Sequence, residues 1–507
     1  VGAQFGEQAL DETVTAGLIG VGLVFLFMLI FYRLPGLVAV ITLTVYIFLT
    51  LAGFNMINGM LTLPGIAALI LGVGMAVDAN IILYERLKDE LRIGRSLKQA
   101  YKKAAASSLW TIVDANLTTL IAAIVLFIFG TSSVKGFATM LLLSILMSFV
   151  TAVFLTRVIM SLIVQSNYAN NKKGWFGVNQ KYIHNIAEGK DIEDLSSPWD
   201  RFDFVKHANK FFALSGIIVL AGIVILFIFK LNLGIDFTSG TRADITTDGN
   251  ATVEQVEDEL ETLGIPPENL TMSGEDKLVA RYSTDLGQED VTSMQSHFNE
   301  LYGHDPMIST VSPVIGQELV QNAVIALIIA SIGIIIYASI RFEWRMAVPA
   351  VLALLHDVFI IIAVFSIFRI EVDITIIAAV LTVVGYSIND TIVTMDRIRE
   401  NNRKIKVIRS EEEINVIINR SLRQTATRSI NTILTVLIVV VFLVLFGATS
   451  IFNFSLALLI GLVSGVYSSF FIAIQLWGVL KRRQLRKSGG EIVVYSEKSK
   501  NDDKVLV

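Results

Sequence analysis

The dominant pattern along the chain is a series of long apolar runs separated by polar segments. Runs of about 17–25 apolar residues are long enough to cross the hydrocarbon core of a membrane as helices. These runs lack the alternation of polar and apolar residues that is typical of barrel strands, so we predict helical spans. The eleven predicted spans cover residues 16–32, 36–54, 61–84, 109–129, 137–164, 211–229, 323–340, 346–368, 374–395, 430–446 and 454–480.

Lys and Arg gather in alternate connections between these spans. The segments after the third and ninth spans and the C-terminal tail are rich in both residues, whereas residues 55–60 contain neither. Short basic loops stay in the cytoplasm. With eleven spans, this bias predicts a multi-pass protein whose N-terminus lies outside and whose C-terminus is cytoplasmic.

One polar segment between spans carries its own pattern of secondary structure. We predict strands at residues 242–246, 278–282 and 307–311 and helices at 253–263 and 291–301. This order fits a small βαββαβ domain of the ferredoxin-like α+β type, outside the membrane. The alternative is a long loop without a fold of its own.

The two membrane halves repeat each other in sequence. At a shift of 311 residues, Glu85 and Arg86 fall on Asp396 and Arg397. Both halves point the same way, because each of these polar helix ends is predicted to be cytoplasmic. Parallel repeats are typical of transporters, whose working site lies between the repeats near the middle of the membrane.

These patterns predict an all-α polytopic membrane protein built from a pseudo-symmetric parallel repeat, with one small α+β outer domain. The predicted segments are a first membrane half (1–165), a linker (166–210), one helix (211–230), the outer domain (231–320), the remaining helices (321–481) and a tail (482–507). The chain starts with Val1 and no signal peptide precedes the first span, so we expect that the natural chain begins earlier.

Composition supports the membrane class and narrows the chemistry. Hydrophobic residues make up 53% of the 507 residues, and charged residues only 17%, against about 25% in soluble proteins. The chain has no Cys, which excludes disulfides and thiol catalysis. A net charge of −4 gives no indication of nucleic-acid binding, and we expect no metal or cofactor. No nucleotide-binding GxxxxGK[ST] loop is present, so an ion gradient is the expected energy source.

Two carboxylic acids lie inside predicted spans. Asp78 lies eight residues before Arg86, which is about 12 Å along a helix, and Asp390 lies at a similar depth before Arg397. A charged side chain in the membrane costs about 2.5–3.5 kcal/mol on insertion scales. We therefore expect acids that are paired, protonated or hydrated, and that carry protons. The alternative is that neighbouring polar groups satisfy each acid, with no titration role.

The two acids are not equivalent under the repeat. At the shift of 311 residues, Asp78 aligns with Asn389 and Asp390 with Ala79. The acid has moved by one position, about 100° around a helix. We expect the two halves to do different jobs on either side of their interface.

Several other ionisable and polar residues lie within or beside the predicted spans, and all but Asp114 have two interpretations. Arg428 is either a counter-charge to one of the two acids or a side chain that reaches the cytoplasmic surface. His356 and Asp357, with Asn80 and Asn389, either extend a proton relay or hydrogen-bond helices together. Asp114 is expected to pack or cap near the membrane surface.

Long stretches around these residues resemble the bacterial SecD and SecF membrane proteins. The matching stretches are LPGIAALILGVGMAVDANIILYER, TIVDANLTTLIAAIVLFIFGTSSVKGFATML, LNLGIDFTSGT, RFEWRMAVPAVLALLHD, VVGYSINDTIVTMDRIREN and ALLIGLVSGVYSSFFIA. In one chain they look like the fused SecDF family, which is related in its membrane fold to RND exporters. The extra N-terminal helix and large outer domain of that family are absent from this sequence, and Ser239 stands where the family often has Gly.

The resemblance implies a transport protein rather than an enzyme. The SecD and SecF proteins are accessories of the Sec translocon in the bacterial cell membrane. By resemblance, we expect this chain to use the proton-motive force to promote polypeptide translocation after the ATPase step. The resemblance implies proton-pathway roles for Asp78, Asp390 and Arg428. It also implies partners, which are the SecYEG channel, YajC-like and YidC-like proteins, the translocating polypeptide, protons and the lipid bilayer. The alternatives are an RND-type small-molecule exporter and a scaffold of the translocon without energy coupling.

Overall fold

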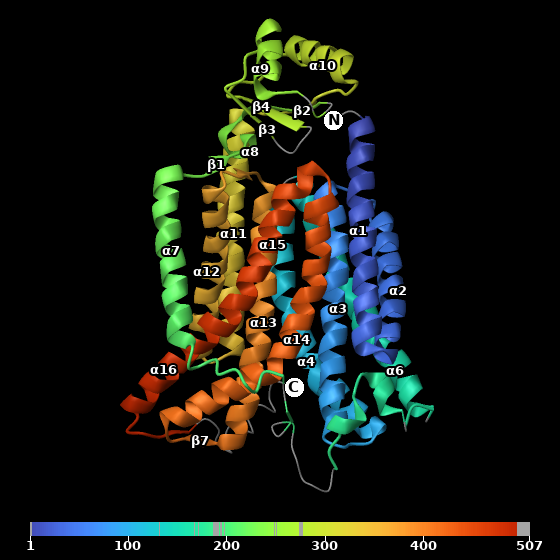
Figure 1. Ribbon diagram of the computed structural model, residues 1–507, viewed down its shortest axis with the longest axis vertical. Helices are drawn as coiled ribbons and strands as arrows, with labels where there is room; N and C mark the ends of the chain where they lie inside the picture. The colour runs from blue at the N-terminus through green and yellow to red at the C-terminus, as the bar shows by residue number, and fades with distance from the viewer. Residues whose placement is uncertain are drawn as a thin grey trace.

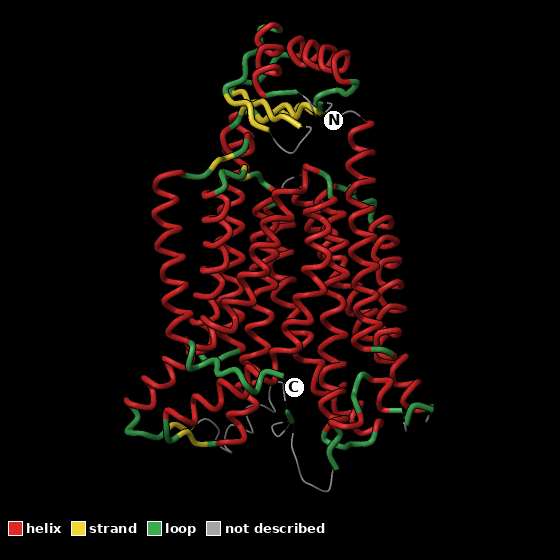
Figure 2. Tube along the Cα trace, viewed as in Figure 1, coloured by secondary structure: helices red, strands yellow, loops and turns green. Residues whose placement is uncertain are grey.

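The computed structural model describes residues 3–493, except residues 131, 167, 171, 186–191, 193–194, 197, 248, 250 and 273–276. Its described residues form a helical bundle with a small domain at one end (Figures 1 and 2). Eleven helices in this part of the chain are long and apolar enough to cross a membrane. The predicted number of spans is therefore confirmed. Residues 494–507 of the predicted tail lie outside the described residues.

The first membrane half occupies one side of the bundle. Its helices are α1 (Ala3–Tyr32), α2 (Leu34–Met56), α3 (Leu63–Arg92), α4 (Leu97–Phe129) and α5 (Ser132–Ser148), which continues through a π-helical segment (Phe149–Leu155) into α6 (Thr156–Gln165). Most of these helices extend beyond the predicted apolar spans, because their polar ends continue the backbone hydrogen bonding outside the hydrocarbon layer.

The second membrane half has the same plan. Its helices are α7 (Ala208–Phe229), α11 (Pro313–Arg341), α12 (Trp344–Ile367), α13 (Thr375–Ile405), α14 (Glu411–Phe446) and α15 (Phe452–Ser468), which continues through a π-helical segment (Ser469–Ala473) into α16 (Ile474–Lys487). The last span of each half thus contains a π-helical segment, a feature often found near functional sites.

Close helix contacts follow the sequence repeat. Gly74 on α3 and Gly385 on α13 correspond under the repeat, and each packs on a helix of the opposite half. A Cβ added to Gly74 would lie 3.1 Å from Val436 on α14, and one added to Gly385 would lie 3.1 Å from Thr119 on α4. The halves therefore meet through two related contacts, α3 with α14 and α13 with α4, around a pseudo-twofold axis.

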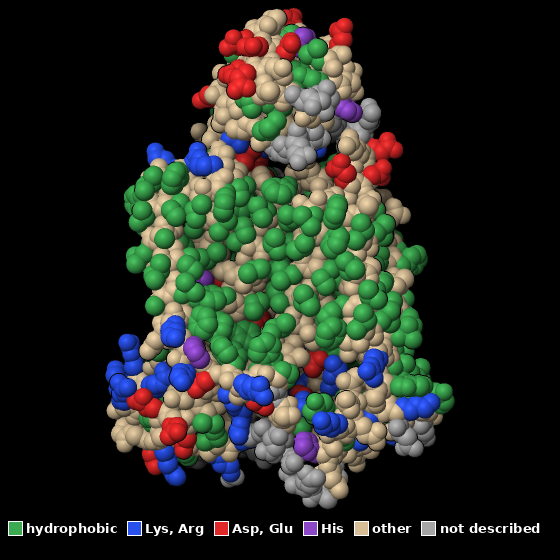
Figure 3. Space-filling view, in the orientation of Figure 1, with side chains coloured by type: hydrophobic (Ala, Val, Ile, Leu, Met, Phe, Trp, Pro, Cys, Tyr) green, Lys and Arg blue, Asp and Glu red, His purple; other side chains and the backbone are tan. Residues whose placement is uncertain are grey.

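The two helices that carry Asp78 and Asp390 are the most enclosed in the bundle. The apolar windows of α3 and α13 are each 89% buried, whereas that of α7 is 11% buried. Hydrophobic side chains cover the visible face of the bundle in a broad belt, and Lys and Arg gather below it (Figure 3). We call the end with Arg86, Arg341, Arg399 and Lys481 the basic end, and the opposite end the domain end.

The small domain is a four-stranded antiparallel sheet with two helices. Its elements are β2 (Gly240–Thr246), α9 (Val253–Thr262), β3 (Asn269–Met272), β4 (Lys277–Tyr282), α10 (Gln288–Tyr302) and β5 (Met307–Val311), with sheet order β3-β4-β2-β5. This is the predicted βαββαβ arrangement, and its core contains Ile245, Val256, Leu260 and Phe298. The sequence pattern missed β3, because most of its four residues are exposed and do not alternate.

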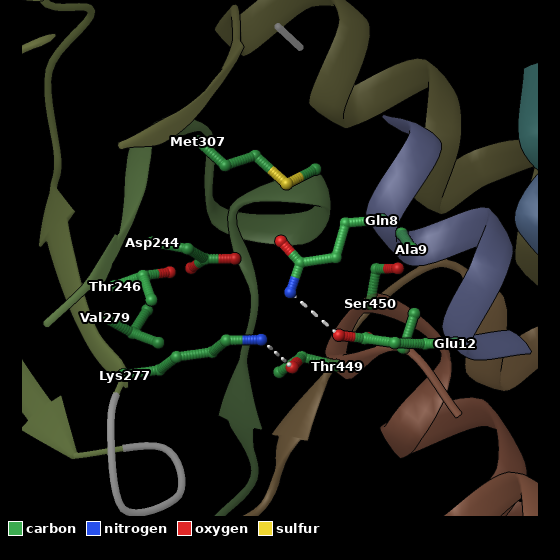
Figure 4. Close-up of a pocket in the computed structure, with 11 residues that line it drawn as sticks. Gln8, Ala9, Glu12, Asp244, Thr246, Lys277, Val279, Met307, Thr449 and Ser450 are labelled. Atoms are coloured by element: carbon green, nitrogen blue, oxygen red, sulfur yellow. Dashed lines mark hydrogen bonds between the residues drawn. The ribbon is translucent and has the colours of Figure 1, made fainter. Parts of the chain in front are cut away.

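Three sets of contacts join the small domain to the bundle. β1 (Asn232–Leu233) pairs in parallel with β6 (Glu371–Val372), and α8 (Ile235–Thr238) follows. Glu371 forms ion pairs with Arg242 at 2.8 Å and Arg281 at 2.7 Å. On the other side of the domain, Lys277 Nζ donates to Thr449 Oγ1 at 2.8 Å beside α1 (Figure 4).

At the basic end of the bundle, away from the small domain, β7 (Val407–Ile408) pairs with β8 (Ile492–Val493).

Candidate functional site

Asp78 lies on α3 in the middle of the interface between the halves and is 4% exposed. Among the described residues, the hydrogen bonds to its side chain come from the second half. Oδ2 accepts from Asn389 Nδ2 at 2.9 Å, and Oδ1 accepts from Thr432 Oγ1 at 2.8 Å and Arg428 Nη2 at 3.2 Å. Among the two interpretations of Arg428, this geometry favours the counter-charge, and its partner is Asp78.

The contact between Asp78 and Asn389 joins two positions that correspond under the repeat. Residues related by a twofold axis meet each other only where they lie on that axis. Asp78 therefore lies near the pseudo-twofold axis of the bundle, and its counterpart amide donates the hydrogen bond that a second carboxylate could not donate. The loss of symmetry at this one position creates a complementary pair.

Asp390, the second acid, lies on α13 in a less satisfied environment. Its Oδ1 accepts a hydrogen bond from Ser429 Oγ of α14. Its Oδ2 is buried and has no hydrogen-bond partner among the described residues. A buried carboxylate oxygen without a hydrogen-bond partner is costly as an anion, so Asp390 is less well stabilised than Asp78.

Adjacent residues of α14 hold the two acids. Arg428 binds Asp78 of the first half, and Ser429 binds Asp390 of the second half. A change in the charge of either acid therefore acts on the same turn of α14. The arrangement provides a direct physical link between two acids that lie on different helices.

Arg428 also lines a cavity of about 530 Å³ that lies toward the basic end. Glu85, Asp89 and Lys88 of α3 contribute polar groups to this cavity, and Tyr182 from the polar segment between the halves also lines it. A second cavity, of about 10 Å³, is lined by Asp78 together with Asn389, Tyr386 and Thr119. The two partners of the ion pair thus line different cavities, the larger at Arg428 and the smaller at Asp78.

His356 and Asp357 lie on α12, and Asp357 is 0% exposed. Its carboxylate accepts hydrogen bonds from Ser387 at 2.6 Å and from Ser464 and Ser468 at 2.7 Å each. His356 Nδ1 lies 3.3 Å from Asp357 Oδ1. These contacts tie α12 to α13 and α15, an arrangement that favours the helix-packing interpretation.

Two further polar residues of the spans, Asp114 and Asn80, differ in what they contact. Asp114 of α4 accepts from Tyr337 Oη at 3.0 Å and Arg341 Nε at 2.8 Å, and so links the halves through α11. Neither side-chain polar atom of Asn80 has a hydrogen-bond partner among the described residues. The structure therefore does not bring Asn80 into the contacts around Asp78.

Sequence reasoning missed several residues that complete the site. Thr432 and Ser429 bind the two acids, and Asn431 Nδ2 donates to Tyr32 Oη at 3.0 Å. A signal was present in the sequence, because Ser429, Asn431 and Thr432 form a polar cluster at the start of an otherwise apolar span. Within the described ranges, no group of three or more His, Asp or Glu side chains could hold a metal ion.

Comparisons with known proteins agree with this architecture. The family model for the protein export membrane protein SecD/SecF, C-terminal, matches residues 1–166 and 291–483, and the SecD/SecF GG motif matches residues 224–251. The protein translocase subunit SecDF of Bacillus subtilis is 56% identical over 493 residues, which are 97% of this chain and 67% of that protein. The protein translocase subunit SecF of Alicyclobacillus acidocaldarius is 39% identical over 57% of this chain and 96% of its own length.

A solved structure gives the same result for the fold. The crystal structure of SecDF, a translocon-associated membrane protein from Thermus thermophilus, superposes with a TM-score of 0.84 and 32% identity, over 95% of this chain and 64% of that chain. The chain thus spans about two thirds of the length of these fused relatives.

Proposed function

The chain belongs to the SecD/SecF family of protein export membrane proteins, and from this premise we propose that it is a protein translocase subunit that couples proton movement to polypeptide export. The observation that carries the proposal is the buried contact of Arg428 with Asp78 across the interface between the halves. The relatives are protein translocase subunits, which supports polypeptides over small molecules as the cargo.

Protonation of Asp78 is the first step of the proposed cycle. A proton on Oδ1 competes with Arg428 and Thr432 for that oxygen and removes the negative charge that holds the guanidinium. A buried cation without its counter-charge is unstable. Arg428 therefore turns toward the polar 530 Å³ cavity that it already lines.

Asp390 is the second proton carrier in the scheme. Its unpartnered Oδ2 favours the protonated form, and its Oδ1 is held by Ser429, the neighbour of Arg428. Movement of this turn of α14 changes both acids together. Protons thus pass through the interface only when the contacts of α14 with α3 and α13 rearrange.

The small domain is placed to follow such a rearrangement. Asp236 of α8 accepts a hydrogen bond from the backbone N–H of Ile374 at 3.0 Å, at the first turn of the helix that carries Asp390. Glu371, three residues earlier, binds Arg242 and Arg281 of the sheet. A shift of α13 is therefore transmitted to the domain, which acts on the exported polypeptide.

The proposed orientation follows from charge. The basic end faces the cytoplasm by the positive-inside rule, so the N-terminus and the small domain lie outside the cell membrane and the C-terminus lies inside. The proposed partners are the SecYEG channel, YajC-like and YidC-like proteins, and the translocating polypeptide.

Proton flux and secretion test the proposal together. In vesicles that contain the chain, Asp78→Asn and Asp390→Asn should each reduce proton flux to the level of empty vesicles, because an amide cannot carry a proton. Secretion in a deletion strain should fall in parallel. Asp114→Asn is the matched control, since it removes another acid of the same interface, and it should retain most of the flux.

Two outcomes would count against coupling. Proton flux that persists in the Asp78→Asn and Asp390→Asn variants would show that neither acid carries protons. Secretion that persists in the double variant would favour a scaffold without energy coupling.

A further inference from the structure

The last part of the linker between the halves lies along the basic end of α14. We call residues 199–207 of this linker the strap. Its hydrogen bonds to α14 involve Asn419, Arg423 and Thr427. These three residues are spaced four apart and therefore share one face of the helix. Arg428, which binds Asp78, directly follows Thr427. The strap thus covers the two turns of α14 that lead up to the ion pair.

The contact nearest the ion pair is made by Trp199. Its Nε1 donates to Thr427 Oγ1 at 3.2 Å. One turn away, Arg423 donates to the backbone carbonyl of Phe202 from Nη2 at 3.0 Å and from Nε at 3.2 Å. Hydrogen bonds along one face of a helix fix its rotation about its own axis as well as its position.

Asn419 holds the far end of the strap. Its Oδ1 accepts from the backbone N–H of Phe204 at 2.8 Å, and its Nδ2 donates to Asp203 Oδ1 at 2.9 Å. The ring of Phe204 also packs against the ring of Phe470, with centroids 5.9 Å apart. Phe470 belongs to the π-helical segment Ser469–Ala473 of the last span. The strap therefore joins α14 to that segment.

Just before the strap, the linker contacts α3, the helix that carries Asp78. Arg92 Nη2 donates to the backbone carbonyl of Ser196 at 2.5 Å, and the carbonyl of Arg92 accepts from the backbone N–H of His184 at 2.7 Å. The linker thus spans α3 and α14, the two helices that Asp78 and Arg428 join. It does so beside the 530 Å³ cavity that Arg428 lines.

We propose that Trp199 is a positioning residue for the ion pair. Its bond to Thr427 sets the rotation of the next residue, Arg428, so that the guanidinium faces Asp78. The consequence for transport rests on the proposed function, in which the same turn of α14 moves when Asp78 takes up a proton. The strap contact and the ion pair then stabilise each other, because coupling between two contacts is reciprocal.

A fluorine label on tryptophan tests this coupling from the side of the acid. The purified chain is labelled with fluorotryptophan, and the fluorine NMR signal of Trp199 is assigned by its absence in Trp199→Phe. Asp78→Asn removes the negative charge, as protonation does, so the turn of α14 should move and the Trp199 signal should shift. The signals of Trp175, in the same linker, and of Trp344, the first residue of α12, should stay. An unchanged Trp199 signal would overturn the proposal.

Asp114→Asn is the matched control for the label. It also removes a carboxylate of the interface between the halves, but one that binds Arg341 of α11 rather than a residue of α14. The Trp199 signal should therefore keep its position in this variant. A shift as large as that in Asp78→Asn would show a general loosening of the bundle and contradict a specific coupling.

Variants of the strap contact test the coupling in the reverse direction. Trp199→Phe keeps an aromatic ring but loses the N–H, and Thr427→Val keeps the side-chain shape but loses the hydroxyl. Loss of one hydrogen bond of ordinary strength changes a two-state equilibrium by about two- to tenfold. Amide exchange should therefore rise by about this factor both in the α14 peptide that contains Arg428 and in the α3 peptide that contains Asp78. Thr427→Ser, which keeps the hydroxyl, should retain the original protection.

The pattern of exchange separates positioning from simple attachment. Faster exchange that is confined to the linker would show that the strap only fastens the linker to the bundle, and the proposal would be wrong. The strap variants leave Asp78 and Asp390 in place, so this measurement decides the question even if Asp78→Asn does not fold.

These measurements need no proton gradient, so they separate this inference from the proposed function. If the Trp199 signal responds to Asp78→Asn but the chain conducts no protons, the positioning role stands and the proton coupling fails. If proton flux and secretion depend on Asp78 but the Trp199 signal does not respond, the proposed function stands and the strap has no part in it.

Discussion

The glycine contacts of the interface obey the repeat, whereas the acids beside them do not. Gly74 and Gly385 correspond, and each lies against the opposite half at the same 3.1 Å from an added Cβ to its nearest neighbour. Asp78 is held by three donors that include a guanidinium, but Asp390 is held by Ser429 alone among the described residues. Symmetry thus places the helices, and departures from symmetry create the different surroundings of the two acids.

The largest expected effect tests the unequal surroundings of the two acids. Arg428→Gln leaves Asp78 without its counter-charge, and breaking a buried ion pair from one side costs about 3–5 kcal/mol. Asp390→Asn removes no ion pair and should cost clearly less. Thermal unfolding of the purified chain measures both.

A rescue experiment separates charge from packing at Arg428. If the loss comes from the stranded anion, Asp78→Asn added to Arg428→Gln should recover most of the stability. A double variant that is less stable than Arg428→Gln alone would show that the side chains pack rather than pair. Equal losses in Arg428→Gln and Asp390→Asn would remove the distinction between the acids.

The next effect tests the symmetric contacts. Gly74→Ala and Gly385→Ala each place a methyl group against the opposite half, and overpacking of this kind costs about 1–3 kcal/mol. We expect Gly385→Ala to cost at least as much, because its nearest neighbour is the backbone Cα of Thr119 rather than a side-chain methyl of Val436.

A glycine outside the interface provides the control for these substitutions. Gly216 on α7 has no atom within 4 Å of an added Cβ, so Gly216→Ala should be neutral or stabilising through helix propensity. Thermal unfolding of all three variants in one detergent gives the comparison. A loss in only one of the two interface variants would contradict the pseudo-twofold packing.

A smaller effect concerns Ser239, which lies between α8 and β2, where the small domain joins the second half. The described residues of the first half contain no such domain. Ser239 has φ 67° and ψ 171°, a region that almost only glycine adopts without strain. Ser239→Gly should therefore stabilise the domain by about 1 kcal/mol, whereas Ser239→Ala keeps the strain and should not. Hydrogen exchange of the β2 amides measures the difference.

The smallest expected effect is a dependence on pH at the domain end. Burial raises the pKa of Asp373, and burial likewise raises the pKa of Asp236. The unfolded chain then releases these protons at lower pH than the folded chain. Stability at this end should fall as pH rises from the unfolded pKa, about 3.9, through the folded values.

Amide exchange near α8 between acidic and neutral pH measures this dependence. Asp236→Asn with Asp373→Asn should flatten it, because an amide does not titrate. A slope that survives in the double variant would assign the pH dependence to other groups. It would leave the contrast between the acids of the membrane interface untouched.

Much of the architecture was readable from the sequence, because long apolar runs have few alternatives to membrane helices. The eleven spans, the small βαββαβ domain and the repeat follow from local patterns of residue type. The pattern did not reveal β3, whose four residues are mostly exposed. It also did not show that Asp114 pairs with Arg341, since ion pairs between distant segments leave no periodic signal.

The sequence by itself determined that Asp78 and Asp390 lie in apolar surroundings, because an ionisable residue inside a long apolar run is visible without a fold. It left two interpretations for Arg428, which lies just before its predicted span. Only the tertiary structure decided that Arg428 faces Asp78, that Ser429 faces Asp390 and that Asn389 meets its repeat counterpart. The physical reason is that depth in a membrane is set by position along one helix. The partner of a charge is set by the rotation and packing of several helices around it.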